Sequence, residues 1–346
     1  MRDVTEMVRR RAWRDNRLPE VFERLPTMLT LEELQMLSFL TENLDAEGVV
    51  LDLGCFVGGS TFALAHGVGR SAARSRHIHS FDLFELDDQG RPTVVAGVPP
   101  DGFSATGQRW GNPLYRWSVH AQQGFAWWIE RVRRSVEQLD IVRIDHFRGF
   151  AGYWEIPASE PTAQKGRWVP APGQALFRAI ADALGPLPII AEDLGVITPD
   201  VDALRREFAF PGMRILQFAW GEDDTAERRF LPHRYEPDTV VYTGSHDNDT
   251  TLGWWASAPE STRHHLREYL ASDGRAVHWD LIRAACASVA DTAVYPLQDV
   301  MGLDGAHRMN FPGQPSGWWV WRFAWEQLPA DAAGRLRRMC ELYDRH

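Results

Sequence analysis

Three acidic residues, Asp145, Glu192 and Asp247, each follow a short apolar run that has the composition of a buried strand. Histidines stand beside two of them, His146 after the first and His246 before the third. A single acid after a strand is commonly a helix cap, but three such residues indicate a site. A pair of carboxylates suits glycosyl transfer, because one can attack the anomeric carbon while the other protonates the leaving oxygen. No spacing of histidine and aspartate resembles a metal triad, so we predict no metal site.

Tryptophan is the second chemical signal in this sequence. The chain contains 15 tryptophans, and only Trp13 lies before residue 110. An aromatic ring stacks on the apolar face of a sugar, while neighbouring polar groups bind the hydroxyls. Burial in the core is the ordinary alternative for any one tryptophan. Clusters at 127–128, 254–255 and 318–321 cannot all point into one core, which favours a surface that binds carbohydrate.

The composition limits the class of protein and of partner. With 346 residues, 44% hydrophobic and 24% charged, the chain is typical of a globular protein with one large domain or two. The net charge of −10 disfavours nucleic acid and anionic membranes as partners. No apolar run approaches the about 18 residues that a membrane helix needs. The same net charge favours a neutral small molecule or polymer as partner. Cys55, Cys286 and Cys340 are odd in number and too far apart for a disulfide scaffold, so we predict a reducing, cytoplasmic location.

Alternating strands and helices must position the three acids. The predicted strands are 139–144, 187–191, 213–218, 239–243 and 292–297, and the predicted helices between them are 173–184, 198–208, 259–272 and 279–287. This alternation is typical of a (β/α) barrel or an open parallel sheet. In barrel enzymes the carboxyl ends of the strands build the active site. Upstream of these units, residues 90–101 are predicted as a turn-rich loop and residues 115–138 as one long amphipathic helix.

The N-terminal segment has a different pattern, a strand at 49–53, a glycine-rich turn and a second strand at 77–82. This βαβ unit resembles the opening of a class I S-adenosylmethionine-dependent methyltransferase. In that reading Gly54 and Gly58 let a cofactor approach the backbone, and Asp82 accepts hydrogen bonds from ribose hydroxyls. A purely structural βαβ unit is the alternative, and we predict no bound cofactor.

From residue 83 to residue 346 the chain closely resembles the amylomaltases, the 4-α-glucanotransferases that are also called disproportionating enzymes. The motifs that carry the resemblance are GVPPD at 97–101, GQRWGNP at 107–113, RIDHFRG at 143–149, AEDLG at 191–195, PGMR at 211–214 and HDNDT at 246–250. So many motifs over most of the chain make the resemblance highly specific.

The resemblance implies a role for each of the three acids. Asp145 would be the nucleophile, Glu192 the general acid and base, and Asp247 the carboxylate that stabilises the oxocarbenium-like transition state. The activity implied is transfer of α-1,4-glucan segments between maltooligosaccharides by a retaining double displacement. Two alternatives remain, an S-adenosylmethionine-dependent methyltransferase and a non-catalytic fusion that binds glucan.

The resemblance also implies a set of substrate-binding residues. Arg143 would orient the nucleophile, and His146 and His246 would hold sugar hydroxyls. Trp110 and Asp101 would line the groove that binds the glucan chain. The expected partners are therefore α-1,4-glucans and maltooligosaccharides. The sequence leads to no prediction of the oligomeric state.

The sequence departs from the family in three places. Gly102 stands where the family usually has tyrosine, and residues 317–319 read Gly-Trp-Trp where Gly-Asn-Trp is usual. The family's first three β/α units are not recognisable, and the methyltransferase-like segment stands in their place. We therefore predict two domains, 1–82 and 83–346, and an α/β fold derived from the (β/α)8 TIM barrel, incomplete, with a Rossmann-like βαβ segment.

The join between the two segments leads to a prediction about strand pairing. The strands at 49–53 and 77–82 are expected to lie parallel, since a right-handed βαβ unit has the handedness of a barrel wall. The second is expected to pair beside the strand at 139–144, which would place Asp82 at the same end as Asp145. The missing units leave the donor side open, so weak or absent activity is expected.

Overall fold

The computed structural model describes residues 12–15, 18–20, 31–43, 50–53, 70, 78–81, 92–100, 104–221, 227–314 and 316–345. The chain forms two compact units, in which residues 1–132 with 152–183 make the first and residues 133–151 with 184–346 make the second. Among the described residues, no helix is both long enough and apolar enough to cross a membrane. The three candidate acids all belong to the second unit.

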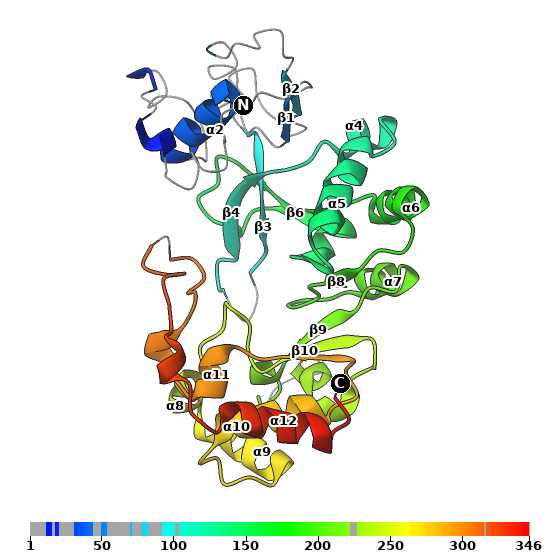
Figure 1. Ribbon diagram of the computed structural model, residues 1–346. Helices are drawn as coiled ribbons and strands as arrows, with labels where there is room; N and C mark the ends of the chain where they lie inside the picture. The colour runs from blue at the N-terminus through cyan, green and yellow to red at the C-terminus, as the bar shows by residue number, and fades with distance from the viewer. Residues whose placement is uncertain are drawn as a thin grey trace. The chain divides into compact units, whose positions relative to one another are not determined.

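A four-stranded antiparallel sheet forms much of the first unit, with the strand order β4–β3–β6–β7 (Figure 1). Its strands are β3 (Val94–Val98), β4 (Gln108–Pro113), β6 (Gly152–Pro157) and β7 (Arg167–Pro170). Helices α2 (Leu31–Asn43), α4 (Trp117–Gln122) and α6 (Gly173–Leu184) belong to the same unit, and α5 (Ala126–Gln138) begins in it. Val95 of β3 pairs with Ile156 of β6, and both are buried, so these strands supply the core of the sheet.

Two sequence predictions for this region are wrong. Residues 90–101, predicted as a loop, contain β3, because Val94 and Val95 fit a half-buried strand and the backbone finds a partner in β6. The single helix predicted at 115–138 is two helices, α4 and α5. The break lies at Gly124 and Phe125, whose φ angles of 61° and 57° are left-handed. A left-handed residue does not continue an α-helix, so the chain turns there.

The second unit is built on a five-stranded parallel sheet with the order β11–β10–β9–β8–β5 (Figure 1). The strands are β5 (Val142–Ile144), β8 (Ile189–Ala191), β9 (Gly212–Ile215), β10 (Thr239–Tyr242) and β11 (Thr292–Val294). The helices are α7 (Pro199–Glu207), α8 (Thr251–Ser257), α9 (Glu260–Leu270), α10 (Val277–Ala287), α11 (Leu297–Met301) and α12 (Ala332–Leu342). The predicted parallel α/β arrangement is confirmed. The strands predicted at 213–218 and 292–297 are shorter, because a 3₁₀ turn at Leu216–Phe218 and Pro296 at the start of α11 end them.

The central strands are buried, as expected for parallel strands that have helices on their faces. Val241 of β10 packs in one apolar cluster with Trp220, Leu266 of α9 and Leu281 of α10, and all four are fully buried. Trp220 therefore belongs to the core and not to a carbohydrate-binding surface. This packing fixes the carboxyl ends of the strands, where Asp145, Glu192 and Asp247 follow.

The N-terminal strands β1 (Val50–Leu53) and β2 (Ile78–Phe81) form a separate two-stranded sheet. They run parallel, with Val50 opposite Ile78, which confirms that prediction. The predicted pairing of the second strand beside 139–144 is wrong for the described residues, since β2 pairs with β1 and β5 pairs with β8. The chain between β2 and β5 enters the antiparallel sheet instead of making one right-handed crossover. Gly54, Gly58 and Asp82 lie outside the described residues.

Candidate functional site

Asp145 stands at the carboxyl end of β5 with its side chain 78% exposed. The guanidinium of Arg143 holds it, because Arg143 Nη2 donates to Asp145 Oδ1 at 2.7 Å. Arg143 is itself fixed from β9, where its Nε lies 3.3 Å from Met213 Sδ. The carboxylate of Asp145 is thus oriented by a charged partner while it stays open to a substrate.

Glu192 follows β8 and continues the ladder with β5, since its N–H donates to Ile144 O and its carbonyl accepts from Phe147 N. Its carboxylate accepts two backbone hydrogen bonds, from His146 N at 2.6 Å and from Leu194 N at 2.7 Å. The residue is only 9% exposed. Burial raises the pKa of Glu192 to about 7, against the two N–H donors, and the nearby charge of Asp145 raises it further. This carboxyl can therefore both donate and accept a proton near neutral pH.

His146 sits between these two acids in the chain, with a left-handed backbone at φ 47°. This conformation is uncommon for a side chain other than glycine, and such residues gather at functional sites. Here the turn aims the His146 N–H at Glu192. Burial lowers the pKa of His146 to about 4, so its ring is neutral at pH 7 and can both donate to and accept from a hydroxyl.

Asp247 lies in the loop after β10, and its side chain is 48% exposed. Asn310 Nδ2 donates to Asp247 Oδ1 at 2.7 Å, and the Arg308 guanidinium donates to the Asp247 carbonyl. His246 Nε2 lies 3.4 Å from Asp247 Oδ2, and the His246 ring lies 5.2 Å from the ring of Trp319. Sequence reasoning missed Arg308 and Asn310, because they stand about 60 residues away in a loop with no distinctive pattern. The aromatic cluster at 318–321 was the signal for Trp319.

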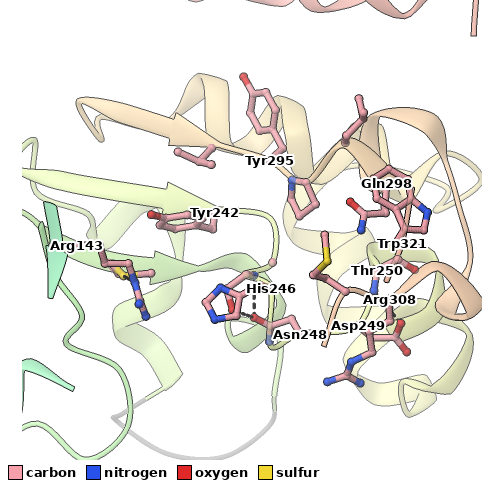
Figure 2. Close-up of a pocket in the computed structure, with 17 residues that line it drawn as sticks. Arg143, Tyr242, His246, Asn248, Asp249, Thr250, Tyr295, Gln298, Arg308 and Trp321 are labelled. Carbon is pink, nitrogen blue, oxygen red and sulfur yellow. Dashed lines mark hydrogen bonds between the residues drawn. The ribbon is translucent and has the colours of Figure 1, made fainter. Parts of the chain in front are cut away.

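A cavity of about 460 Å³ lies beside these residues in the second unit. Figure 2 shows Arg143 and Tyr242 on one side of it and His246 next to Asn248, with Tyr295 and Trp321 also among its walls. The cavity brings together Arg143 in β5 and His246 after β10, two of the predicted site residues. Asp145, Glu192 and Asp247 are not among its lining residues. Its size is that of a site for a small ligand.

The loop that carries Glu192 is anchored by its neighbour Asp193, whose side chain is fully buried. Asp193 Oδ1 accepts from Met213 N at 2.7 Å, and its Oδ2 accepts from Arg214 Nη1 at 3.0 Å. Arg205, also buried, lies with its Nε 3.7 Å from the same Oδ2. A methyl group on Gly212 would lie 2.7 Å from that oxygen, so only glycine fits there. Sequence reasoning did not single out Asp193.

Replacing Asp193 is expected to destabilise the second unit strongly. Asp193→Ala removes the buried carboxylate that Arg205 and Arg214 share, and removing one member of a buried ion pair costs about 3–5 kcal/mol. Chemical denaturation measures this loss in the free energy of unfolding. Asp331→Ala, on an exposed aspartate before α12, should change it by less than about 0.5 kcal/mol. A loss below about 1 kcal/mol for Asp193→Ala would contradict a buried charged cluster.

Glu192 should make the stability of the protein depend on pH. Its folded pKa of about 7 lies above the ordinary value of 4.5, so the folded state binds this proton more tightly than the unfolded chain. The contribution of Glu192 to stability is complete below pH 4.5 and is lost as the pH rises through 7. Glu192→Gln removes this dependence. The free energy of unfolding of the variant, measured relative to wild type, should therefore rise by about 3 kcal/mol between pH 4.5 and pH 8.

The measurement is the free energy of unfolding of both proteins across this pH range. The exposed Glu341→Gln in α12 is the control and should show no such trend. A difference between Glu192→Gln and wild type that does not change with pH would mean that Glu192 titrates normally.

The remaining predicted residues lie elsewhere. Trp110 is on β4 of the first unit, 41% exposed, with its Nε1 donating to Gln108 Oε1 at 3.2 Å. Asp101 lies outside the described residues. Within the described part of the chain, no group of three or more His, Cys, Asp or Glu side chains could hold a metal ion.

Comparisons with known sequences agree with this geometry. A family model described as 4-alpha-glucanotransferase matches residues 75–327. The chain is 54% identical over 272 residues to the 4-alpha-glucanotransferase of Thermus thermophilus, which covers 76% of this chain and 54% of that protein. It is 52% identical over 266 residues to the 4-alpha-glucanotransferase of a Synechocystis species, covering 76% of this chain and 52% of that one. The chain thus spans about half the length of these curated relatives.

Solved structures give the same result. An amylomaltase from Streptococcus agalactiae in complex with acarbose matches with a TM-score of 0.73 and 38% identity, over 76% of this chain and 53% of that chain. An amylomaltase from Corynebacterium glutamicum matches with a TM-score of 0.62 over 99% of this chain and 59% of that chain. At 18% identity the second match supports the fold alone. These matches give no support to the methyltransferase alternative.

Proposed function

Because the chain belongs to the 4-alpha-glucanotransferase family, we propose that it transfers α-1,4-glucan segments between maltooligosaccharides by a retaining double displacement. The observation that carries this proposal is the pair of carboxyl groups at the ends of β5 and β8. Asp145 is exposed and held by Arg143, whereas Glu192 is buried, held by two backbone N–H groups, and has a pKa of about 7. Two carboxyl groups in such different environments are suited to different roles.

In the first step Asp145 attacks the anomeric carbon of the donor and forms an ester with it. The glycosidic C–O bond breaks, and Glu192 gives its proton to the departing 4-oxygen. Glu192 is protonated in a large fraction of molecules at neutral pH, since its pKa is about 7. The leaving segment therefore departs as a neutral alcohol.

In the second step the 4-hydroxyl of an acceptor glucan loses its proton to Glu192 and attacks the same carbon. The ester to Asp145 breaks, the new α-1,4 bond forms, and both carboxyl groups return to their first state. Asp247 stabilises the positive charge that develops on the sugar in each step. Asn310 supports this role, because its amide holds Asp247 Oδ1 at 2.7 Å.

The substrate-binding residues are proposed on chemical grounds. The neutral ring of His146 and the ring of His246, which lines the cavity of about 460 Å³, suit sugar hydroxyls. Arg143 supports the same assignment because it both holds Asp145 and lines this cavity. Trp110 and Asp101 are proposed to line the glucan groove, as the resemblance implies.

We also propose an assignment of the fold in more detail. We assign the five parallel strands to an incomplete (β/α)8-derived barrel in a domain of residues 83–346, with residues 1–82 as a Rossmann-like segment. The parallel order β11–β10–β9–β8–β5 and the amylomaltase match support the first assignment, and the parallel β1–β2 pair supports the second. A reducing, cytoplasmic location stays a proposal from cysteine usage.

Incubation with maltotriose tests the function. Transfer yields glucose together with maltopentaose and longer chains, whereas hydrolysis yields glucose and maltose without longer products. Chromatography of the products should show the longer chains, at a rate that the incomplete barrel keeps low. The absence of both glucose and longer chains would refute the activity. Titration calorimetry showing maltooligosaccharide binding without turnover would then favour the non-catalytic alternative.

A further inference from the structure

Arg229 bridges two backbone carbonyls of the loop that follows Glu192. Its Nη2 donates to Asp193 O at 2.9 Å and to Gly195 O at 3.1 Å. Arg229 comes from the 3₁₀ turn at Glu227–Phe230, and its guanidinium also lies 4.7 Å from the ring of Phe230. A distant part of the chain thus clamps the residues on both sides of Leu194.

The clamp acts on the peptide group between Asp193 and Leu194. The Asp193 carbonyl and the Leu194 N–H belong to this one planar group and point in opposite directions. Arg229 binds the carbonyl side, and Glu192 Oε1 accepts from the N–H side at 2.7 Å. Holding the carbonyl therefore fixes where the N–H points. A cation on the carbonyl also polarises the peptide and strengthens the N–H as a donor.

The second carbonyl makes the turn rigid. Gly195 has a left-handed φ of 77°, which turns its carbonyl back toward the same guanidinium. The Asp193 side chain anchors the loop separately to β9 through Met213 N and Arg214. The Asp193 side chain thus fixes the position of the loop, while Arg229 fixes the orientation of one peptide within it.

We propose that Arg229 is a positioning residue for Glu192, which it controls by orienting the 193–194 peptide so that the Leu194 N–H stabilises the ionised carboxylate. Among the described residues, the other charged or titratable groups that face Glu192 are Arg143 in β5 and Asp145 and His146 after it. Asp193, Asp202 and Arg214 face the Arg229 guanidinium. Arg229, from the 3₁₀ turn at Glu227–Phe230, adds a positive charge that interacts with Glu192. This inference rests on the proposed function only in that Glu192 is the general acid and base there.

The consequence concerns the pH at which Glu192 releases its proton. Without the clamp, the ionised carboxylate loses an aimed donor and a nearby positive charge. Both losses favour the protonated form, so the pKa of Glu192 should rise. A residue that only stabilised the fold would leave this pKa unchanged.

The test is the titration of the Glu192 carboxyl by ¹³C NMR in protein labelled at the glutamate side-chain carboxyl carbon. The signal is assigned by its loss in Glu192→Gln. Arg229→Met, which keeps an unbranched side chain but removes the charge and every donor, should raise the midpoint by about one pH unit. Arg229→Lys, which keeps the charge and a donor, should stay close to wild type.

The matched control is Arg206→Met, which removes an exposed arginine that pairs with Glu236 at 2.7 Å. It should leave the Glu192 midpoint unchanged. If near-ultraviolet circular dichroism shows that Arg229→Met does not fold, Arg229→Gln decides, since it stays polar but lacks the charge and is too short to bridge the two carbonyls. A folded Met or Gln variant with the wild-type midpoint overturns the proposal. Because the readout needs no turnover, failure of glucan transfer and failure of this inference are separate results.

Discussion

Asp145→Asn is expected to lower glucan transfer from maltotriose by at least about a thousandfold, because an amide does not form the glycosyl ester. The fold should be unaffected, since the side chain is 78% exposed and its pair with Arg143 contributes little to stability. The measurements are the rate of longer-chain formation and the melting temperature of both proteins.

Asp140→Asn is the matched control for this variant. Asp140 is exposed and lies just before β5, so its loss should leave both the transfer rate and the melting temperature unchanged. An Asp145→Asn protein that keeps more than about a tenth of the wild-type rate would exclude Asp145 as the nucleophile.

Glu192→Gln should separate proton donation from nucleophilic attack. With maltooligosaccharides as donors the loss of the general acid is expected to cost about 10²- to 10⁴-fold in rate. With α-maltotriosyl fluoride the first step should proceed at close to the wild-type rate, because fluoride leaves without a proton. The second step still needs Glu192 as base, so a covalent glycosyl-protein intermediate should accumulate.

The comparison of the two donors is the measurement for Glu192. Fluoride release is followed with an ion-selective electrode, and product chains are followed by chromatography. Equal losses with maltotriose and with the fluoride donor would show that Glu192 does not act as the proton donor of the first step.

Apolar periodicity in the sequence was sufficient for the parallel sheet of the second unit. Each of the five predicted runs contains a strand, because buried parallel strands are continuous apolar segments bounded by turns. The ends of these strands were less predictable. Leu216 and Phe218 are apolar but lie in a 3₁₀ turn, since their side chains pack into the core from a non-extended backbone.

The antiparallel sheet could not be predicted in the same way. Its strand β3 contains Gly97 and precedes two prolines, and local composition alone favours a loop there. The strand exists because β4 and β6, 10 and 54 residues further on, supply its backbone partners. The wrong pairing of β2 with β5 has the same origin, since strand pairing depends on contacts that no local pattern encodes.

In the candidate site too, residues with a local sequence pattern were predictable and those held by distant contacts were not. Asp145, Glu192 and Asp247 were predictable because each follows an apolar run. Asn310 and Arg229 were not, because Asn310 contacts Asp247 from about 60 residues away in the chain, and Arg229 contacts the backbone beside Glu192 from about 40 residues away. Such supporting contacts depend on tertiary structure, and only the motif-bearing residues leave a signal in the sequence.

The central claim is that Asp145 carries the glucan segment from donor to acceptor. Its most direct test is mass spectrometry of Glu192→Gln protein after acid quenching during reaction with α-maltotriosyl fluoride. Peptide mapping should show a maltotriosyl group on the peptide of residues 144–148 and, by fragmentation, on Asp145. Fluoride release with the label on another residue, or with no labelled peptide at any time, would contradict the account.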